Sequence, residues 1–295
     1  MLVITGPTGN VGTELTRALA EQGEAAPPYR VAAHNVERIH REFGEHVPTV
    51  FLDFDDRTTW GNALDGVTTL FLLYPVPKPK TVTTWMKPFA DAAMEAGVQH
   101  IIYVTVPGAD RLKFVPHYKV ERHIESSGTP HTFLRCSYFA QNLVRNISTH
   151  GIDIAEHDEI YIPGGKGKTT FLDSRDVAAV ILDVVRDPAP HRNKTYLLTG
   201  PQRLDFFECA EILTDVLERS ITYAKPSMLG FWRRLRKRKV TWDVIAFMTI
   251  VYTLTRFDKN DPEGSDLPQL LGREATTFRV FAEDYKWRWE TATWT

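Results

Sequence analysis

The chain has 295 residues, of which 43% are hydrophobic and 24% are charged, and its formal net charge is −2. This length exceeds one average domain but suits one large α/β unit with an appendage, and the composition is that of an ordinary globular protein. A net charge so close to zero gives no composition-level argument for nucleic acid or for an acidic partner.

The first twelve residues predict a strand, a tight turn and the start of a helix. An apolar run through Ile4 leads into three glycines spaced by three, and a helical pattern begins among them. In a dinucleotide fold the first glycine turns the chain, the second lets backbone approach a pyrophosphate, and the third lets the helix pack on the strand. Free amides at the helix start then face the phosphates. The predicted dinucleotide-binding residues are Gly6, Thr8, Gly9, Asn10, Val11 and Gly12. The alternative is a glycine-rich turn without a ligand.

Further apolar strands are expected along the next hundred residues, at 29–33, 49–53, 68–73 and 101–106. Helical patterns separate them at 36–43, 58–64 and 85–96, and a sixth unit follows with a helix over 118–127 and a strand over 131–135. Strands without polar alternation, interleaved with helices, indicate a parallel sheet that is covered on both faces. Because such crossovers are right-handed, we expect a doubly wound, Rossmann-like α/β fold with ligands at the carboxyl ends of the strands.

From about residue 138 the pattern becomes irregular, with short predicted strands, a helix starting at Ser174 and another over 206–217. We therefore expect a dinucleotide-binding domain over 1–137 and a smaller, mostly helical substrate lid over 138–295 that shares its core. The longest apolar stretch, 245–254, is too short to span a bilayer and predicts a buried helix. Most aromatic residues of the tail are expected in the core: Trp232, Trp242, Phe247, Tyr252, Phe278, Phe281 and Trp287.

The end of the second strand bears on the choice of cofactor. A carboxylate there favours NAD, whereas a basic residue accommodates the 2′-phosphate of NADP. Here the strand is followed by His34 and Arg38, with no carboxylate at its tip, which favours NADP. NAD stays open because Glu37 lies close by. Asp53, at the end of the third strand, is a candidate for the adenine rim or a plain turn residue.

The start of the helix after the fifth strand carries candidate catalytic residues. Many short-chain dehydrogenases use a tyrosine with a lysine four residues later, which lowers the tyrosine pKa. Here Arg122 stands four residues after Tyr118, so the usual pair is broken. His117 and Tyr118 remain as candidates for hydrogen bonding or proton donation, and the alternative for His117 is a helix-start residue without chemistry. We expect the nicotinamide over the strand ends, near Tyr74, Pro75 and Thr105.

Two other features suggest sites less strongly. The basic run over 233–239 could bind nucleic acid, an acidic partner or phosphates, but in a slightly acidic chain a solvated basic segment is the favoured interpretation. His150 and His157, near Asp153 and Asp158, match no metal-binding spacing, so no metal is expected.

The chain resembles NmrA-like members of the atypical short-chain dehydrogenase/reductase family, nearest to the branch of NAD(P)H-dependent quinone and triphenylmethane-dye reductases. The glycine turn, the segments 95–103 and 127–135, and Asn142 carry the resemblance, and the segments 240–243 and 270–281 match more loosely. The resemblance implies a histidine beside the nicotinamide at the place of His117, where other branches have a lysine.

Two functions follow from the residues and the resemblance together. The first is an NADPH-dependent reductase that passes hydride to an electron-poor small molecule, such as a quinone, a dye, or a conjugated or iminium natural product. The second is a non-catalytic, NADP-binding redox sensor, which the broken tyrosine–lysine pair and the basic run suit. Cys136 and Cys209 lie far apart in no metal or redox spacing. Because the first strand also begins at Met1, with no signal or transit peptide before it, we expect a cytoplasmic location. The sequence leaves the oligomeric state open.

Overall fold

The computed structural model describes four stretches of the chain: residues 1–75, 80–145, 149–259 and 262–290. These form two compact units. Unit 1 comprises Met1–Cys136 and Arg175–Leu197, and unit 2 comprises Ser137–Ser174 and Leu198–Thr295. The chain thus leaves unit 1 near the predicted boundary at residue 137 but returns to it for 23 residues of helix and strand. The role of residues 138–295 as a substrate lid stays a prediction.

Unit 1 is built on a seven-stranded sheet with the order β10-β6-β5-β4-β1-β2-β3. The strands are β1 (Leu2–Ile4), β2 (Tyr29–Ala33), β3 (Thr49–Phe51), β4 (Thr69–Leu73), β5 (His100–Thr105), β6 (His131–Cys136) and β10 (Lys194–Leu198). Neighbouring strands from β3 to β6 all run parallel, and Ile4 pairs with Val31 on one side and Phe71 on the other. The strand order therefore reverses between β1 and β4. In sheets of this kind, that reversal marks the place where ligands bind.

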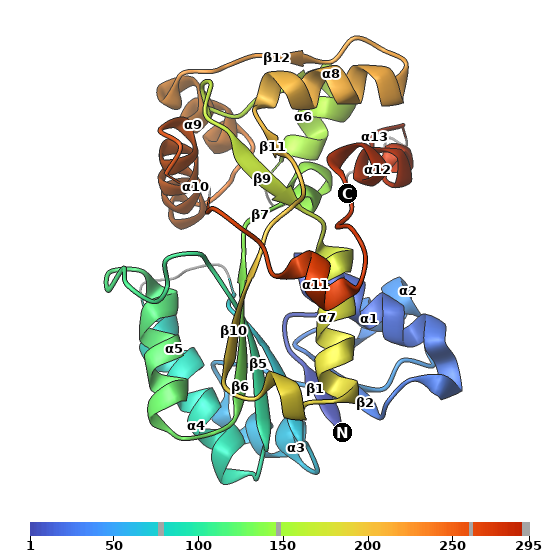
Figure 1. Ribbon diagram of the computed structural model, residues 1–295, viewed down its shortest axis with the longest axis vertical. Helices are drawn as coiled ribbons and strands as arrows, with labels where there is room; N and C mark the ends of the chain where they lie inside the picture. Colours follow the sequence, from blue (N-terminus) through green and yellow to red (C-terminus); the bar gives the residue numbers. More distant parts are fainter. Residues whose placement is uncertain (76–79, 146–148, 260–261, 291–295) are drawn as a thin grey trace. The chain divides into compact units, whose positions relative to one another are not determined.

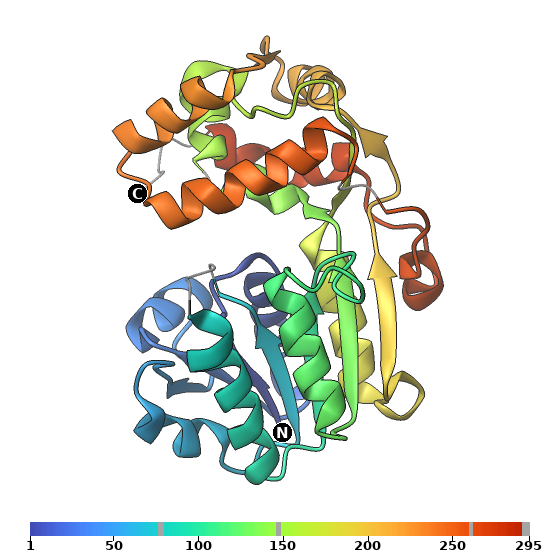
Figure 2. The ribbon, with the colours of Figure 1, turned by 90° about the vertical axis from the view of Figure 1, so that its left-hand side faces the viewer.

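Helices cover both faces of this sheet, which explains why its central strands are apolar throughout. They are α1 (Asn10–Gln22), α2 (Val36–Phe43), α3 (Trp60–Leu64), α4 (Lys87–Glu95), α5 (Pro116–Ser126) and α7 (Ser174–Arg186), with short turns η1 (Gly23–Ala25), η2 (Arg57–Thr59), η3 (Val82–Met86) and η5 (Ala189–His191). Figures 1 and 2 show α1 and α7 on one face and α4 and α5 on the other. The predicted doubly wound, Rossmann-like α/β fold is confirmed.

Unit 2 combines two small sheets with helices. Its strands are β7 (Tyr138–Phe139), β8 (Glu159–Ile160), β9 (Thr169–Leu172), β11 (Arg203–Leu204) and β12 (Thr222–Tyr223). Its helices are η4 (Ala140–Val144), α6 (His150–His157), α8 (Phe206–Leu217), α9 (Met228–Lys237), α10 (Trp242–Arg256), α11 (Leu267–Leu271), α12 (Phe278–Asp284) and α13 (Lys286–Glu290). Strand β9 runs parallel to β7 and antiparallel to β11, and β8 pairs in parallel with β12. Aromatic side chains fill the core, where the ring centroids of Phe171 and Phe278 lie 5.0 Å apart.

Helix α10 corrects the expectation of a buried helix over 245–254. One face is buried through Ile245, Met248 and Tyr252, but Phe247, Ile250 and Leu254 are 47%, 59% and 41% exposed. Their spacing of three and four residues places them on one stripe of the helix. Trp242 and Trp287 are also more than half exposed. The expectation of core aromatics is therefore right for Tyr252, Phe278 and Phe281, and wrong for Trp242, Trp287 and Phe247. No described helix has the length and apolarity needed to cross a bilayer.

Candidate active site

The glycine turn joins β1 to α1 within unit 1. Gly6 has φ +61°, a left-handed conformation that favours glycine, and its carbonyl accepts the Gly9 amide at 2.9 Å. A Cβ on Gly12 would stand 2.2 Å from the Gly6 oxygen, so the start of α1 rests directly on the turn. A Cβ on Gly9 would stand 2.5 Å from Cδ2 of Leu73. Packing against Leu73 therefore favours glycine at position 9, independently of the predicted approach of a ligand.

The start of α1 is suited to an anion. Gly9 is the N-cap, no side-chain hydrogen bond caps the helix there, and its first turn holds no acidic residue. The Val11 side chain is completely buried, whereas Thr8 and Asn10 are half-buried. The amides at a helix start and the positive end of the helix dipole attract phosphate. A glycine turn that is closed to a Cβ by backbone at Gly12, followed by a helix start without a side-chain cap, fits the pyrophosphate of a dinucleotide.

The tips of β2 and β3 bring two of the predicted residues together. Nε2 of His34 lies 3.5 Å from Oδ2 of Asp53, and the His34 side chain is 73% exposed. Arg38 lies in the first turn of α2, where its amide donates to the N-cap Asn35 at 2.8 Å. Its guanidinium lies 3.9 Å from Glu42 and is more than half exposed. An exposed histidine and an exposed arginine thus stand close in sequence at this edge.

Three rings meet at the carboxyl ends of β4 and β5. His117, in the first turn of α5, lies with its ring centroid 4.7 Å from that of Tyr74 and 5.6 Å from that of Tyr103. The Tyr103 hydroxyl lies 2.7 Å from Nδ1 of His117. Tyr103 belongs to β5 and is completely buried, whereas His117 and Tyr74 are half-buried. Of the predicted residues, Tyr74 and His117 are therefore brought together, and Tyr103 is a member of the group that the sequence reasoning missed.

Burial keeps this cluster uncharged. It lowers the pKa of His117 from 6.5 to about 4 and raises the pKa of Tyr103 well above 10. The pKa of Tyr74 is also raised by burial, against a hydrogen bond with Thr81 that lowers it. At neutral pH the imidazole and both phenols are neutral, so His117 can exchange hydrogen bonds but carries no proton ready to give as an imidazolium.

Of the other predicted residues, Tyr118 and Thr105 make contacts outside this cluster. Tyr118 lies against its own helix, with the Arg122 guanidinium 5.8 Å from its ring centroid. Thr105 is 1% exposed, and its hydroxyl donates to Oε1 of Glu121 at 2.8 Å. The Thr105 side chain is thus engaged in the protein interior. Pro75 follows Tyr74 and is half-buried.

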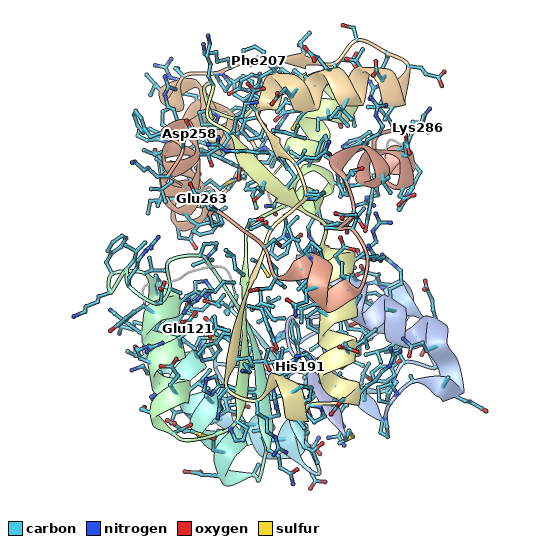
Figure 3. All side chains as sticks on the ribbon, viewed as in Figure 1. Glu121, His191, Phe207, Asp258, Glu263 and Lys286 are labelled. Atoms are coloured by element: carbon cyan, nitrogen blue, oxygen red, sulfur yellow. The ribbon has the colours of Figure 1, made fainter. Side chains whose placement is uncertain are left out.

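A buried ion pair supports this end of the sheet and was not predicted. Glu121, on α5 (Figure 3), has no exposed surface and accepts Nη2 of Arg135 at 2.7 Å. Arg135 also lies 3.6 Å from Asp110, in the segment between β5 and α5. Glu121 stands four residues after His117, a spacing that puts both on one side of a helix. The four-residue spacing of His117 and Glu121 can be read from the sequence. The sequence does not show that Arg135 is the ion-pair partner of Glu121.

The basic run lies in unit 2 and is only partly solvated. Arg234 and Arg238 both contact Asp153, each at 2.7 Å, and Asp153 is 1% exposed. These arginines join the start of α6 to α9. The expectation of a solvated segment is wrong for these two and right for Arg233 and Lys237, which are exposed.

Outside this site, we looked for a metal-ligand group and for a hollow in the part of the chain that the structure describes. No group of three His, Cys, Asp or Glu side chains there is suited to a metal ion. A hollow of about 460 Å³ lies between α3 and α4, and is lined by residues that include Arg57, Trp60 and Asp91. It contains none of the predicted site residues.

Comparison with known proteins found relatives of this chain in sequence and in structure. A sequence model of the NmrA-like family matches residues 1–266. The NAD(P)H azoreductase of Xenophilus azovorans is 28% identical over 288 residues, which cover 96% of this chain and 97% of the azoreductase.

Solved structures share the fold. The triphenylmethane reductase of Citrobacter sp., solved with NADP(H), superposes with a TM-score of 0.79 at 22% identity, covering 96% of this chain and 99% of that one. The NADPH-dependent quinone oxidoreductase of Escherichia coli, solved with NADPH, gives a TM-score of 0.80 at 21% identity, with 97% and 100% covered.

Proposed function

Because the chain belongs to the NmrA-like family, we propose that it is an NADPH-dependent reductase that transfers hydride to an electron-poor small molecule. The observation that carries the proposal is the glycine turn at α1. Backbone atoms leave no room for a Cβ at Gly12, Gly6 has a left-handed conformation, and no side-chain hydrogen bond caps the helix behind them. The azoreductase relative, which matches over nearly the whole chain, supports the same conclusion.

The dinucleotide would be held by backbone at its centre and by side chains at its adenosine end. Amides from Asn10 to Gly12, in the first turn of α1, would receive the pyrophosphate. His34 and Arg38 would meet a 2′-phosphate, which is why we propose NADPH ahead of NADH. Asp53, beside His34, would meet the adenosine rim.

At the other end, the chain would bind and orient, while the redox chemistry belongs to the cofactor. A bound nicotinamide supplies the hydride. Tyr74 and His117 would border the reacting face, and His117 would offer a hydrogen bond to the acceptor. Orientation and the exclusion of water would provide most of the rate enhancement. Quinones, azo and arylmethane dyes, and conjugated or iminium compounds all fit this chemistry, because each accepts hydride without a strong acid.

Steady-state oxidation of NADPH with a panel of quinones, azo dyes and arylmethane dyes tests the proposal. We expect turnover with at least one acceptor class and a preference for NADPH over NADH. The rival function is that of a dinucleotide-binding redox sensor, which would bind NADPH tightly without turnover on any acceptor. That result would contradict the reductase proposal.

We also propose a cytoplasmic location. Its support is that Cys136 and Cys209 are both free thiols and both buried, as expected for a chain that folds in a reducing compartment.

A further inference from the structure

We propose that Tyr103 is a positioning residue that fixes His117 in the tautomer with its proton on Nε2, leaving an Nε2–H group to donate to the bound acceptor. The tautomer follows from the protein alone. The donation to an acceptor rests on the proposed reductase function.

The position of the Tyr103 hydroxyl is set by the centre of the sheet. Tyr103 pairs in register with Leu72 of β4 and Phe133 of β6, so its backbone is held on both sides. Its ring is completely buried and meets the edge of Phe133, with the ring centroids 6.2 Å apart at 83°. A phenol packed in this way has little freedom to turn, and its oxygen lies 2.7 Å from Nδ1 of His117.

The direction of that hydrogen bond follows from the chemistry of the two groups. A neutral imidazole has one N–H donor and one acceptor nitrogen, so Nδ1 alone does not reveal its role. Tyr103 keeps its proton because burial, together with the nearby Tyr74 and the negative charge of Glu121, raises its pKa well above 10. Among the described residues, the hydrogen-bond partner of the Tyr103 hydroxyl is Nδ1 of His117. The hydroxyl therefore donates, Nδ1 accepts, and the imidazole proton is left on Nε2.

The surroundings of His117 oppose a second proton on the ring. His117 lies in the first turn of α5, an 11-residue helix whose amino end carries the positive pole of the helix dipole. Tyr74 covers part of the ring, and the anionic group nearest in sequence on the helix, Glu121, is paired with Arg135. Burial lowers the pKa of His117 to about 4, in agreement with this geometry.

These constraints define what His117 contributes. The Nε2–H group stabilises negative charge that develops on an oxygen or nitrogen of the acceptor. It does not hand over its proton, because the replacement would have to come from Tyr103 and leave a buried phenolate. The proton that completes the reduced product then comes from water. His117 thus acts as a neutral hydrogen-bond donor, as known for imidazoles placed at helix amino ends.

The chain contains a matched control for the Tyr103–His117 pair. In the same unit, the Tyr196 hydroxyl lies 3.0 Å from Nδ1 of His191. Tyr103→Phe and Tyr196→Phe each remove one phenolic oxygen from one imidazole, but only the first pair lies at the carboxyl ends of the strands. A loss that comes merely from deleting a buried hydroxyl should appear in both variants.

Two-bond ¹H–¹⁵N correlation spectra of the uniformly labelled full chain test the tautomer directly. The His117 signals are assigned with His117→Asn. We expect wild-type His117 to show only the Nε2–H tautomer, with no titration between about pH 6 and pH 9. In Tyr103→Phe the two tautomers should mix, while Tyr196→Phe leaves the His117 signals unchanged. A wild-type ring protonated on Nδ1, or an unmixed Nε2–H tautomer in Tyr103→Phe, would overturn the proposal.

Kinetics provide the second readout. Tyr103→Phe should lower kcat about tenfold, the equivalent of one hydrogen bond, with the dissociation constant for NADPH unchanged. Equal losses in Tyr103→Phe and Tyr196→Phe would contradict the positioning role. Should Tyr103→Phe fail to fold, the wild-type spectrum still decides the tautomer. An enzyme without turnover but with the expected spectrum would refute the reductase function and leave the tautomer standing.

Discussion

Glu121 and Arg135 form an ion pair whose carboxylate is completely closed to solvent, with Nη2 of Arg135 2.7 Å from Oε2 of Glu121. The pair joins α5 to the end of β6. The Thr105 hydroxyl donates to the same carboxylate, which ties in the end of β5 as well. The helix that presents His117 is therefore anchored one turn further on, so Glu121 is expected to matter for stability and for the placement of His117.

We expect Glu121→Ala to lower the free energy of unfolding by about 3–5 kcal/mol, because it leaves the Arg135 charge 15% exposed and without its main partner. Urea denaturation measures the loss. The matched control is Arg279→Ala, which breaks a 2.9 Å pair with Asp215 in which both side chains are about half exposed or more. That change should cost less than about 1 kcal/mol. Similar losses of unfolding free energy in Glu121→Ala and Arg279→Ala would show that the buried Glu121–Arg135 pair contributes no more to stability than the exposed pair does.

Gly12→Ala should damage the dinucleotide site. The new Cβ would stand 2.2 Å from the Gly6 oxygen, which forces α1 away from the turn. We expect NADPH to bind at least about tenfold more weakly, and overpacking to cost about 1–3 kcal/mol of stability.

The control for this change is Gly61→Ala, in helix α3, where a Cβ would meet nothing within 4 Å. Alanine there should leave NADPH affinity unchanged and raise stability by up to about 1 kcal/mol. Isothermal titration with NADPH distinguishes the two variants. Unchanged affinity in Gly12→Ala would show that the turn tolerates a side chain and would weaken the assignment of the pyrophosphate site.

Cofactor preference should depend on Arg38. We expect Arg38→Ala to weaken NADPH binding about tenfold while leaving NADH binding unchanged, because a charged hydrogen bond to the 2′-phosphate contributes about 1.5–3 kcal/mol. Arg41, exposed on the same helix, supplies the control, and Arg41→Ala should alter neither affinity. Parallel losses for NADPH and NADH in Arg38→Ala would rule out a contact with the 2′-phosphate.

Stability should fall in mild acid. Burial, assisted by the charges of Arg192, His131 and His191, lowers the pKa of His100 from 6.5 to about 4. Burial also lowers the pKa of His150 to about 4, although Asp153 opposes this shift. Between pH 6.5 and pH 4 the unfolded chain therefore binds more protons than the folded chain, so the free energy of unfolding declines as the pH falls through this range and levels off below it.

From pH 7 to pH 5 we expect each of these two histidines to contribute a loss of about 2 kcal/mol. Urea denaturation at the two pH values measures the total. His117, whose pKa burial also lowers to about 4, contributes a similar loss. His100→Asn should therefore remove about a third of the decline, and His46→Asn, at an exposed position, should leave it intact. A decline of the same size in His100→Asn and in the wild type would show that His100 is not the source.

Much of the fold could be predicted from local pattern. Helix α8 has the predicted bounds, and it begins at Phe206 because Asp205 and Glu208 form a reciprocal cap there. Helix α2 follows Asn35 for the same reason, since its side chain accepts the Arg38 amide. Cap residues, glycines and apolar strands act over a few residues, so the sequence displays them directly.

The parts that could not be predicted depend on contacts distant in the chain. The apolar pattern of α10 does not tell which of its faces meets the core, and Phe247 and Ile250 are in fact exposed. Arg234 and Arg238 look like solvated charge until Asp153, about 80 residues away, is placed between them. At the candidate site, the sequence could single out His117, but the contacts of Tyr103 and Arg135 depend on the register of β5 and β6.

The fate of the hydride itself tests the proposed reductase function most directly. The full chain is incubated with an arylmethane dye and NADPH deuterated at C4 of the nicotinamide, in ordinary water, and the reduced dye is examined by mass spectrometry. Both C4 epimers are tested, because only one of them carries the label at the transferred position. With that epimer, hydride transfer places one deuterium at the central carbon of the leuco dye, where it does not exchange with solvent. Tight NADPH binding without any deuterium in the product from either epimer, repeated with a conjugated or iminium acceptor, would contradict the reductase function.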